Sequence, residues 1–150
     1  MLKEFIVKKS TIPGAGKGLF VNRDVKKGER IIEYLGEIIS WKECDIRAER
    51  DEGGYVFYVN RNKCIDAFHT PEAYARYAND AKGLTKIKSV KNNCQYEIYK
   101  KTGWISATKN IKSGSEVFVS YGAQYWRDIR YNMKLEKQKL KEEKLNNKSK

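Results

Sequence analysis

Residues 13–20, PGAGKGLF, combine three glycines with a lysine and could bind a ligand through the backbone. A phosphate-binding Walker loop needs Ser or Thr directly after its Gly-Lys pair, because the hydroxyl holds magnesium. Here Gly18 follows Lys17. A dinucleotide-binding loop opens a long helix, whereas LFV and the turn NRDVKKGE follow here. The pattern therefore predicts a glycine turn between two short strands, where a ligand approaches the backbone closely.

The cysteines and the histidine do not have the spacing of metal ligands. Cys44, Cys64 and Cys94 are far apart in the sequence, no C-x-x-C pair occurs, and His69 is the only histidine. Structural zinc sites need paired ligands at short spacing. We therefore expect no bound metal and no disulfide framework, with reduced cysteines that belong mostly to the core.

Length and composition indicate one folded domain. The chain has 150 residues, of which 40% are hydrophobic, and this is enough to bury a core. We expect the domain to span residues 1–126, followed by a basic C-terminal helix or tail over 127–150. The apolar run at the N-terminus is too short for a signal peptide, and no stretch approaches the length of a membrane span. An intracellular protein without membrane contact is expected.

The net charge of +12 is distributed unevenly. Residues 1–75 hold 13 Lys and Arg against 12 Asp and Glu, and residues 76–150 hold 18 against 7. The lysine-rich half suits phosphate contacts, although in the tail the charges equally serve solubility. A predicted short helix, WKECDIRAERDEGG, carries the acidic residues Glu43, Asp45, Glu49, Asp51 and Glu52. They form either a solvated helix face or an acidic wall beside a groove for a basic peptide.

Short strands must position these residues. Eight segments are rich in Val, Ile, Tyr and Phe and are bounded by turn residues, which predicts a mainly β fold; they are residues 4–10, 18–23, 30–40, 55–60, 63–68, 95–100, 104–109 and 115–122. The turns VKKGER and IKSGSE predict left-handed backbone at Gly28 and Gly114. Thr70 and Pro71 predict the N-cap and first residue of a short helix. Residues 125–145 predict a long C-terminal helix with poor apolar spacing.

Six motifs occur in a fixed order along the chain: a GxG turn, YLGEII, CIDAF, ARYAND, NNCQY and GSEVFVSYG. Over residues 5–126 this series resembles the SET domain of protein lysine methyltransferases. The shortness of the chain and the ending SYGAQYW are similar to the minimal SET proteins of large DNA viruses and microbial eukaryotes. The resemblance implies a mainly β SET-domain fold of several small sheets, a pseudoknot-like C-terminal closure, short helices and a C-terminal helix.

The resemblance also implies methyl transfer from S-adenosylmethionine to a lysine amine, without a metal. It places Gly16, Lys17 and Gly18 against this cofactor. Tyr121 in VSYG matches the catalytic tyrosine, and Tyr34 in EYLGE matches a tyrosine that lines the lysine channel. Further catalytic and cofactor contacts are implied for Tyr96, Tyr58, Arg76, Asn79, Asp80 and Trp126.

Several of these assignments have a specific reason. Tyr96 in NCQY matches the position that limits the number of methyl groups, so lower methylation states are favoured. Asn79 matches the asparagine that binds the methionine part of the cofactor, and either Tyr58 or Tyr55 is expected beside it. Trp126 stacks on adenine, covers the channel or simply packs in the core. Asp66 in CIDAF is expected to be a structural anchor.

The chain departs from the family pattern after Asn79. Asp80 replaces a histidine, and a lysine-rich insertion over residues 81–92 separates Asn79 from Asn93 more widely than in the family. The insertion is either a disordered excursion or a loop that faces substrate or DNA. The zinc-binding cysteines of a post-SET segment are missing, so either the C-terminal helix or the second subunit of a homodimer must close the channel.

We expect an S-adenosylmethionine-dependent lysine methyltransferase that acts on a histone tail in the nucleus, with the basic half on nucleosomal DNA. One alternative is a catalytically weak or inactive SET-like module that binds chromatin or nucleic acid, which Asp80 and the insertion favour. Another is a methyltransferase of a non-histone protein, because any lysine fits an aromatic channel.

Overall fold

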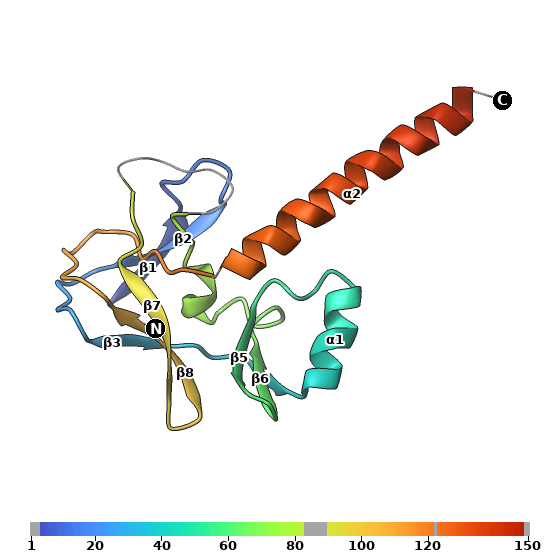
Figure 1. The fold of residues 1–150 in the computed structure, drawn as a ribbon. Coiled ribbons are helices and arrows are strands. Elements are labelled where there is room, and N and C mark those ends of the chain that lie inside the picture. Colours follow the sequence, from blue (N-terminus) through green and yellow to red (C-terminus); the bar gives the residue numbers. More distant parts are fainter. Residues whose placement is uncertain (1–3, 83–89, 122, 149–150) are drawn as a thin grey trace. The chain divides into compact units, whose positions relative to one another are not determined.

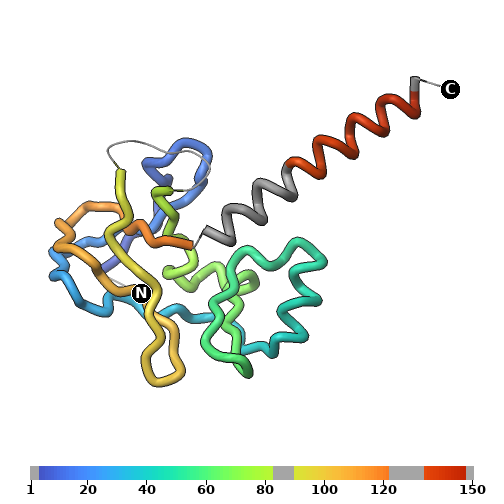
Figure 2. The backbone as a smooth tube through the Cα atoms, viewed as in Figure 1, coloured from blue at the N-terminus to red at the C-terminus, as the bar shows by residue number. Residues whose placement is uncertain are grey.

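The computed structural model describes residues 4–82, 90–121 and 123–148, without the side chains of residues 123–133 and 148 (Figure 2). The chain divides into two compact units, Met1–Ser120 and Tyr121–Lys150, here called the first and the second unit. The predicted C-terminal helix is present as α2 (Ala123–Lys148) in the second unit. The predicted domain boundary after residue 126 stays a prediction.

The described part of the first unit is built from three small antiparallel sheets (Figure 1). The strand orders are β1-β2, β3-β8-β7 and β4-β6-β5. The strands are β1 (Phe5–Lys9), β2 (Lys17–Val21), β3 (Arg30–Glu33), β4 (Glu37–Ile39), β5 (Val56–Asn60), β6 (Lys63–Asp66), β7 (Cys94–Tyr99) and β8 (Thr102–Ala107). The fully buried side chains of Leu19, Val21, Ile105, Val117 and Val119 come from segments far apart in the sequence, which is how the small sheets share a core.

The predicted strand over residues 30–40 is wrong, because this segment is two strands that belong to different sheets. β3 pairs with β8 and β4 pairs with β6. Between them, Gly36 lies against the backbone of Asp66, where an added Cβ atom would be 2.5 Å from the carbonyl oxygen. Only glycine allows this approach. The chain therefore passes from one sheet to the next at residues 34–36.

The two similar turns pack against each other and exchange equivalent hydrogen bonds. The backbone of Val25 and that of Ile111 bond each other in both directions at 2.8 Å. Asn110 Oδ1 accepts from the N–H of Lys27 at 2.9 Å, and Asp24 Oδ1 accepts from the N–H of Ser113 at 2.9 Å. Gly28 and Gly114 have φ values of 92° and 91°, so the predicted left-handed glycines are confirmed.

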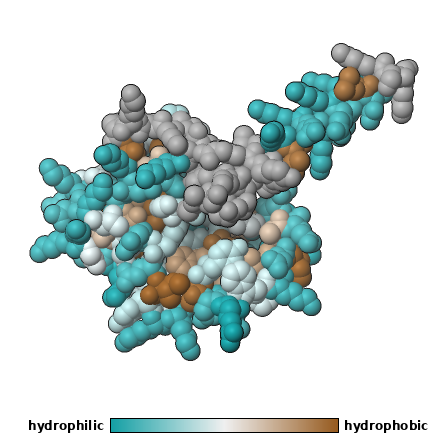
Figure 3. Space-filling model, in the orientation of Figure 1, coloured by the Kyte–Doolittle hydropathy of each residue, from teal (hydrophilic) through white to brown (hydrophobic). Residues whose placement is uncertain are grey.

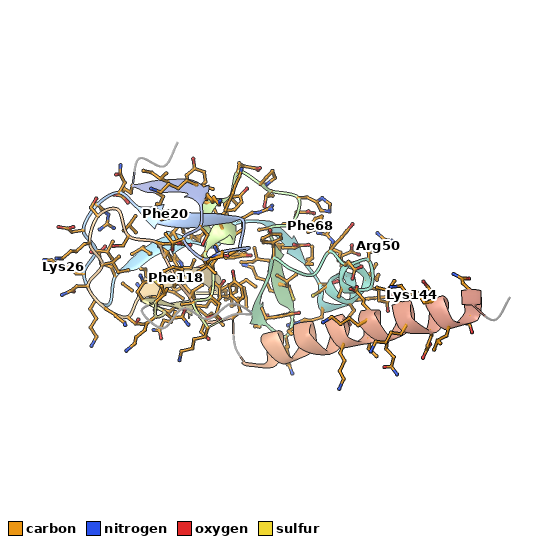
Figure 4. The ribbon with its side chains drawn as sticks, turned by 90° about the horizontal axis from the view of Figure 1, so that it is seen from above. Phe20, Lys26, Arg50, Phe68, Phe118 and Lys144 are labelled. Atoms are coloured by element: carbon orange, nitrogen blue, oxygen red, sulfur yellow. The ribbon has the colours of Figure 1, made fainter. Side chains whose placement is uncertain are left out.

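The last segment of the first unit is threaded between earlier parts of the chain. It forms isolated bridges instead of the predicted strand, which pair Phe20 with Glu116, Asn79 with Phe118, and Cys94 with Val119. One side of the segment thus bonds to β2, and the other side bonds to two stretches that flank the insertion. This is the predicted pseudoknot-like closure. Figure 4 shows the labelled Phe20 and Phe118 in the interior of this region.

The helices of the first unit are short. Helix α1 (Trp41–Glu49) begins after Ser40, whose side chain accepts a hydrogen bond from the Glu43 N–H. The helix predicted to start at Pro71 is wrong: a turn links the Ala73 N–H to the Thr70 carbonyl, and only a 3₁₀ turn, η1 (Tyr74–Tyr77), follows. None of the described helices has the length and hydropathy of a membrane span.

Candidate active site

Three aromatic rings from two of the sheets meet in the first unit. Tyr34 directly follows β3, Phe57 lies in β5 and Tyr96 lies in β7. The ring centroids are 5.4 Å apart for Tyr34 and Phe57, 5.3 Å for Phe57 and Tyr96, and 6.2 Å for Tyr34 and Tyr96. The two contacts of Tyr96 are edge-on, which is a favoured arrangement of aromatic rings. Tyr34 and Tyr96, predicted from motifs far apart in the sequence, are therefore brought together.

Backbone contacts hold these rings in place. The buried Tyr34 hydroxyl donates to the Tyr55 carbonyl at 2.8 Å. Phe57 packs so closely on Gly103 of β8 that an added Cβ atom would lie 2.9 Å from the ring. The sequence reasoning missed Phe57. The sequence offers no signal for it, because YVFYVN is apolar or aromatic on both faces of the strand; in the structure Phe57 and Val59 are buried while Tyr58 between them is exposed.

Tyr58 lies on the other face of β5, away from these rings. Its ring stacks on Trp41 of α1 at 4.6 Å, and its hydroxyl is 3.5 Å from Cys44 Sγ. Of the two tyrosines considered for the pocket, Tyr55 lies closer to the motif residues, because the Arg76 guanidinium sits 4.0 Å from its ring centroid. We therefore replace Tyr58 with Tyr55 in the candidate site.

The glycine turn and the ARYAND motif also meet. Asn79 Nδ2 donates to the Lys17 carbonyl at 3.0 Å, across 62 positions of the sequence. Gly14 and Gly16 have positive φ, and nothing lies within 4 Å of a Cβ atom added to either. The side of the turn on which side chains would stand is therefore open at Gly14 and Gly16, next to the exposed Lys17.

Glu116 is the centre of a buried hydrogen-bond network beneath this turn. Its carboxylate accepts from Ser10 Oγ at 2.7 Å, from the Thr11 N–H at 2.9 Å and from Thr11 Oγ1 at 2.7 Å. Asn79 Nδ2 also reaches Glu116 Oε2, at 3.4 Å. A Cβ atom on Gly18 would lie 2.3 Å from the same oxygen, so Gly18 makes room for the carboxylate. The sequence reasoning missed Glu116, although a lone acid heading the buried run VFV was a signal.

The Arg76 side chain binds backbone carbonyl groups of the segment after β6. Its Nη1 atom donates to the carbonyls of Ala67 and Phe68 at 2.7 and 3.0 Å. Its guanidinium lies over the rings of Tyr55 and Tyr77. Its buried Nε atom has no hydrogen-bond partner among the described residues. Arg76 therefore joins the segment after β6 to η1, and it positions Tyr55.

Asp80 and Asn92 close the base of the insertion. Asp80 Oδ1 accepts from the Lys82 N–H at 2.8 Å and from Asn92 Nδ2 at 3.1 Å, while Asn92 Oδ1 accepts from the Ala81 N–H at 2.8 Å. Residues 83–89 of the insertion lie outside the described residues. Asn93 still bonds the same threaded segment as Asn79, since its Oδ1 accepts from the Phe118 N–H at 2.9 Å.

Arg47 of the acidic helix α1 binds three carboxylates. This guanidinium pairs with Glu37, Glu43 and the fully buried Asp66 at 3.2, 3.0 and 2.8 Å. The hydrogen bonds and charge of Arg47 lower the pKa of Glu37. Asp66 also accepts from the Phe68 N–H at 2.9 Å. It is thus a structural anchor, which ties the sheet β4-β6-β5 to α1.

The remaining predicted residues lie in the second unit. Tyr121 is its first residue, two positions after Val119, and its placement against Tyr34 and Tyr96 stays a prediction. The side chain of Trp126 lies outside the described residues. No group of three His, Cys, Asp or Glu residues suited to a metal ion occurs in the described part of the chain.

Comparison with known proteins identifies the family. Residues 16–122 match the SET domain family. The chain is 30% identical over 135 residues to histone-lysine N-methyltransferase EZH2 of Chaetomium thermophilum, covering 82% of this chain and 8% of that protein. It is 29% identical over 131 residues to N-lysine methyltransferase KMT5A of Xenopus tropicalis, covering 80% of this chain and 37% of that protein. The chain thus spans well under half the length of these curated relatives.

Solved structures agree with the fold. A crystal structure of an active polycomb repressive complex 2 in the basal state matches with a TM-score of 0.63 and 31% identity, over 79% of this chain and 15% of that chain. A structure of ctPRC2 in complex with H3K27me3 and H3K27M matches with a TM-score of 0.65 and 30% identity, over 81% of this chain and 15% of that chain. The predicted mainly β SET fold is confirmed, and the chain belongs to the SET domain family.

Proposed function

We propose that this SET domain is a protein-lysine N-methyltransferase that uses S-adenosylmethionine. The observation that carries the proposal is the cluster of Tyr34, Phe57 and Tyr96, in which rings from two sheets make an aromatic surface of the kind that suits a lysine side chain. The similarity to named lysine methyltransferases supports the reaction class.

The residues around the glycine turn fit an amino-acid-like cofactor. The open space at Gly14 and Gly16 allows a ligand to approach the turn, the exposed Lys17 offers a cation for a carboxylate, and Asn79 binds the Lys17 carbonyl. Bound there, S-adenosylmethionine supplies a methyl group on a sulfonium sulfur, for transfer to the lysine nitrogen. We assign its amino-acid end to Gly16, Lys17 and Gly18, with Asn79 as the residue that positions them.

The aromatic residues prepare the lysine for this transfer. A lysine amine has a pKa of about 10.4, so its deprotonation at pH 7 costs about 4.6 kcal/mol. An apolar channel that excludes water disfavours the ammonium form and lowers this cost. The rings attract the cation before it loses its proton to water. The channel would hold the neutral nitrogen aligned with the methyl group that the bound cofactor would supply, so orientation would lower the barrier as well.

The tyrosine hydroxyls have separate roles in this proposal. Tyr121 orients the amine, and Tyr34 keeps its ring fixed because its hydroxyl is held by the Tyr55 carbonyl at 2.8 Å. Tyr96 occupies space at the end of the channel, which favours lower methylation states. Tyr96→Phe should raise the share of more highly methylated product in mass spectra, whereas an unchanged distribution would remove Tyr96 from this role.

We further propose that the substrate is a histone tail, that the protein acts on chromatin in the nucleus, and that its basic surface contacts nucleosomal DNA. The names of the relatives and the separation of charge along the chain support this assignment. Preferential methylation of nucleosomes over free histone peptides, with a steep salt dependence, is expected. Equal activity on both at several salt concentrations contradicts the DNA contact. A homodimer stays a prediction.

The test is methyl transfer from labelled S-adenosylmethionine to core histones, nucleosomes and a cell extract. Tyr34→Phe and Tyr121→Phe should lose the signal, and Tyr58→Phe serves as the matched control because Tyr58 lies on the other face of β5. Label on a non-histone protein alone would replace the histone proposal. Loss of the signal in Tyr58→Phe as well would contradict the assigned site.

A second candidate function rests on Asp80. Its carboxylate is engaged at the base of the insertion, at 2.8 Å from the Lys82 N–H, in the place where the family pattern has a histidine. A SET-like module that binds chromatin without catalysis is the corresponding proposal. Calorimetric titration with S-adenosylmethionine separates the two, since absence of cofactor binding favours the module and micromolar binding favours the enzyme.

A further inference from the structure

Two hairpin turns of the first unit lie next to each other. The hairpin β5–β6 turns at residues 60–63 and the hairpin β7–β8 turns at residues 99–102. Figure 1 shows both turns at the same end of the unit. Lys63 Nζ donates to the Lys101 carbonyl at 2.8 Å, which ties one turn to the other.

This pair of turns is strongly basic. We call it the hairpin-turn surface, and define it by the cations Arg61, Lys63, Lys100 and Lys101. Lys63 is half-buried and the other three are exposed, and neither turn contains an acidic residue. Of the acids on the neighbouring strands, Glu97 of β7 contacts Arg30 at 3.0 Å, and Glu33 of β3 lies opposite Trp104 of β8. In the space-filling view, hydrophilic residues cover most of the visible face of the unit (Figure 3).

The backbone of the second turn is unusual for the residues it carries. Lys100 and Lys101 have φ values of 47° and 63°, and they form the two-residue loop between Tyr99 and its partner Thr102. Such loops need left-handed backbone at both positions, and Asn-Gly is the favoured pair. Left-handed backbone costs roughly 1 kcal/mol or more at an ordinary residue. The turn therefore has lysine at two positions where the backbone conformation favours Asn and Gly. Compared with Asn-Gly, the two lysines add two positive charges.

An aromatic residue supports the same turn. The Arg30 guanidinium lies 3.7 Å from the centroid of the Tyr99 ring, and Lys100 Nζ lies 5.3 Å from it. These contacts keep a fifth cation, Arg30, beside the two turns. The rings of Trp41 and Tyr58 are stacked on each other, and Trp41 Nε1 donates to the Asn60 carbonyl at 2.8 Å. The turns are thus held by packing and hydrogen bonds, while Arg61, Lys100 and Lys101 are exposed to solvent.

We propose that the hairpin-turn surface binds the phosphate backbone of duplex DNA. Charge complementarity favours a polyanion, and phosphate contacts from Lys and Arg need no base recognition. The choice of DNA rests on the proposed function, because a histone-directed enzyme works beside DNA. The inference goes beyond that function in placing a DNA contact on the first unit, in addition to the lysine-rich insertion and tail.

The test uses the full chain, a short fluorescent duplex of random sequence and anisotropy at several salt concentrations. Lys100→Asn with Lys101→Gly (K100N/K101G) replaces both cations by the favoured turn pair. Each phosphate contact contributes about 0.9 to the slope of log K against log salt, so the slope should become shallower by about 1.8. Affinity near 0.1 M salt should fall about tenfold or more.

The same variant should be at least as stable as the wild type in urea unfolding, because Asn-Gly relieves the left-handed lysines. Weaker DNA binding together with lower stability would instead indicate damaged folding. K100R/K101R then separates damaged folding from the loss of phosphate contacts, because it keeps both positive charges at the same two positions. Wild-type DNA affinity in K100R/K101R supports the proposal, and weak binding in that variant overturns it.

A matched control removes two neighbouring lysines from another exposed turn. Lys26 and Lys27 lie in the first of the two similar turns, and Figure 4 shows Lys26 at the opposite end of the unit from Arg50 of the segment after α1. K26Q/K27Q should bind DNA nearly as the wild type does. An equal loss in K26Q/K27Q and K100N/K101G would overturn the proposal, because it would indicate attraction by net charge alone. Binding to phosphatidylserine vesicles without binding to DNA would also overturn it.

The outcome is separable from that of the proposed function. K100N/K101G should methylate a free histone peptide at the wild-type rate, because the turns are not part of the aromatic cluster. Loss of DNA binding in K100N/K101G with no methyl transfer by any variant would leave the hairpin-turn surface in place and remove the enzymatic proposal. If K100N/K101G is active and keeps its DNA affinity, the enzymatic proposal stands and the DNA-binding role of the hairpin-turn surface is removed.

Discussion

Replacing Glu116 with Gln tests whether the buried carboxylate holds the glycine turn and Asn79 together. Glu116 is 5% exposed and accepts hydrogen bonds from Ser10 Oγ, from the N–H and hydroxyl of Thr11, and from Asn79 Nδ2. Gln has the same shape but only one acceptor oxygen. If that oxygen stays on Thr11, the new amide group faces Ser10 and the donor group of Asn79.

The expected loss of stability follows from these contacts. A hydrogen bond to a charged group contributes about 1.5–3 kcal/mol. Glu116→Gln weakens the two bonds to Thr11 and loses two acceptor contacts on the other oxygen, although the Ser10 hydroxyl can rotate and accept instead. We expect a decrease of about 3 kcal/mol in the free energy of unfolding. The melting temperature should fall by about 6–12 °C for a chain of this size.

The assay is urea unfolding followed by circular dichroism, together with calorimetric titration of S-adenosylmethionine. Glu72→Gln is the matched control, because Glu72 is exposed and its replacement should change stability by less than about 0.5 kcal/mol. Asn79→Ala and the double variant complete a cycle, which should give a coupling of at least about 0.5 kcal/mol. A change in Glu116→Gln no larger than in Glu72→Gln would refute the role assigned to this network.

Other predictions concern the remaining buried groups. Arg47→Met should destabilise the protein by about 3–5 kcal/mol in urea unfolding, because it leaves the buried Asp66 carboxylate without its cation; a loss under about 1 kcal/mol would contradict this role. Since Arg47 lowers the pKa of Glu37, the stability from this pair is full above about pH 4.5 and is lost as the pH falls through the lowered value, so the difference in stability between wild type and Arg47→Met should narrow at acid pH by the contribution of this pair. Burial raises the pKa of Cys64 to about 11 and that of Cys94 to about 12, so at pH 8 both thiols should react with a disulfide reagent only after unfolding; rapid labelling of the native protein would contradict their burial.

The local turns and the order of the motifs could be read from the sequence. Gly28 and Gly114 were predicted as left-handed because few other residues adopt that backbone, and both are confirmed. The predicted mainly β fold also follows from local signals, since short β-branched and aromatic runs alternate with turn residues; the set of several small sheets was implied by the resemblance to the SET domain. Tyr34 and Tyr96 could be predicted as site residues because each lies within a short, continuous sequence motif.

Which face of β5 points to the site was decided by tertiary structure. Neighbouring residues of a strand point to opposite faces, and the run YVFYVN is apolar or aromatic on both. Helix α1 covers one face and stacks Trp41 on Tyr58, while Gly103 admits Phe57 on the other. Local sequence does not encode which neighbour covers which face, so Phe57 was missed and Tyr58 was chosen.

The network around the glycine turn was decided in the same way. The sequence by itself determined the glycine turn that precedes β2, and the resemblance to the SET domain predicted Asn79 as a cofactor contact. It did not determine that Glu116 lies between them or that Asp80 closes the insertion with Asn92. These contacts join residues up to 106 positions apart. A buried polar group is satisfied by whichever partner the folded chain brings within hydrogen-bonding distance, and that partner is known only when the threaded segment is in place.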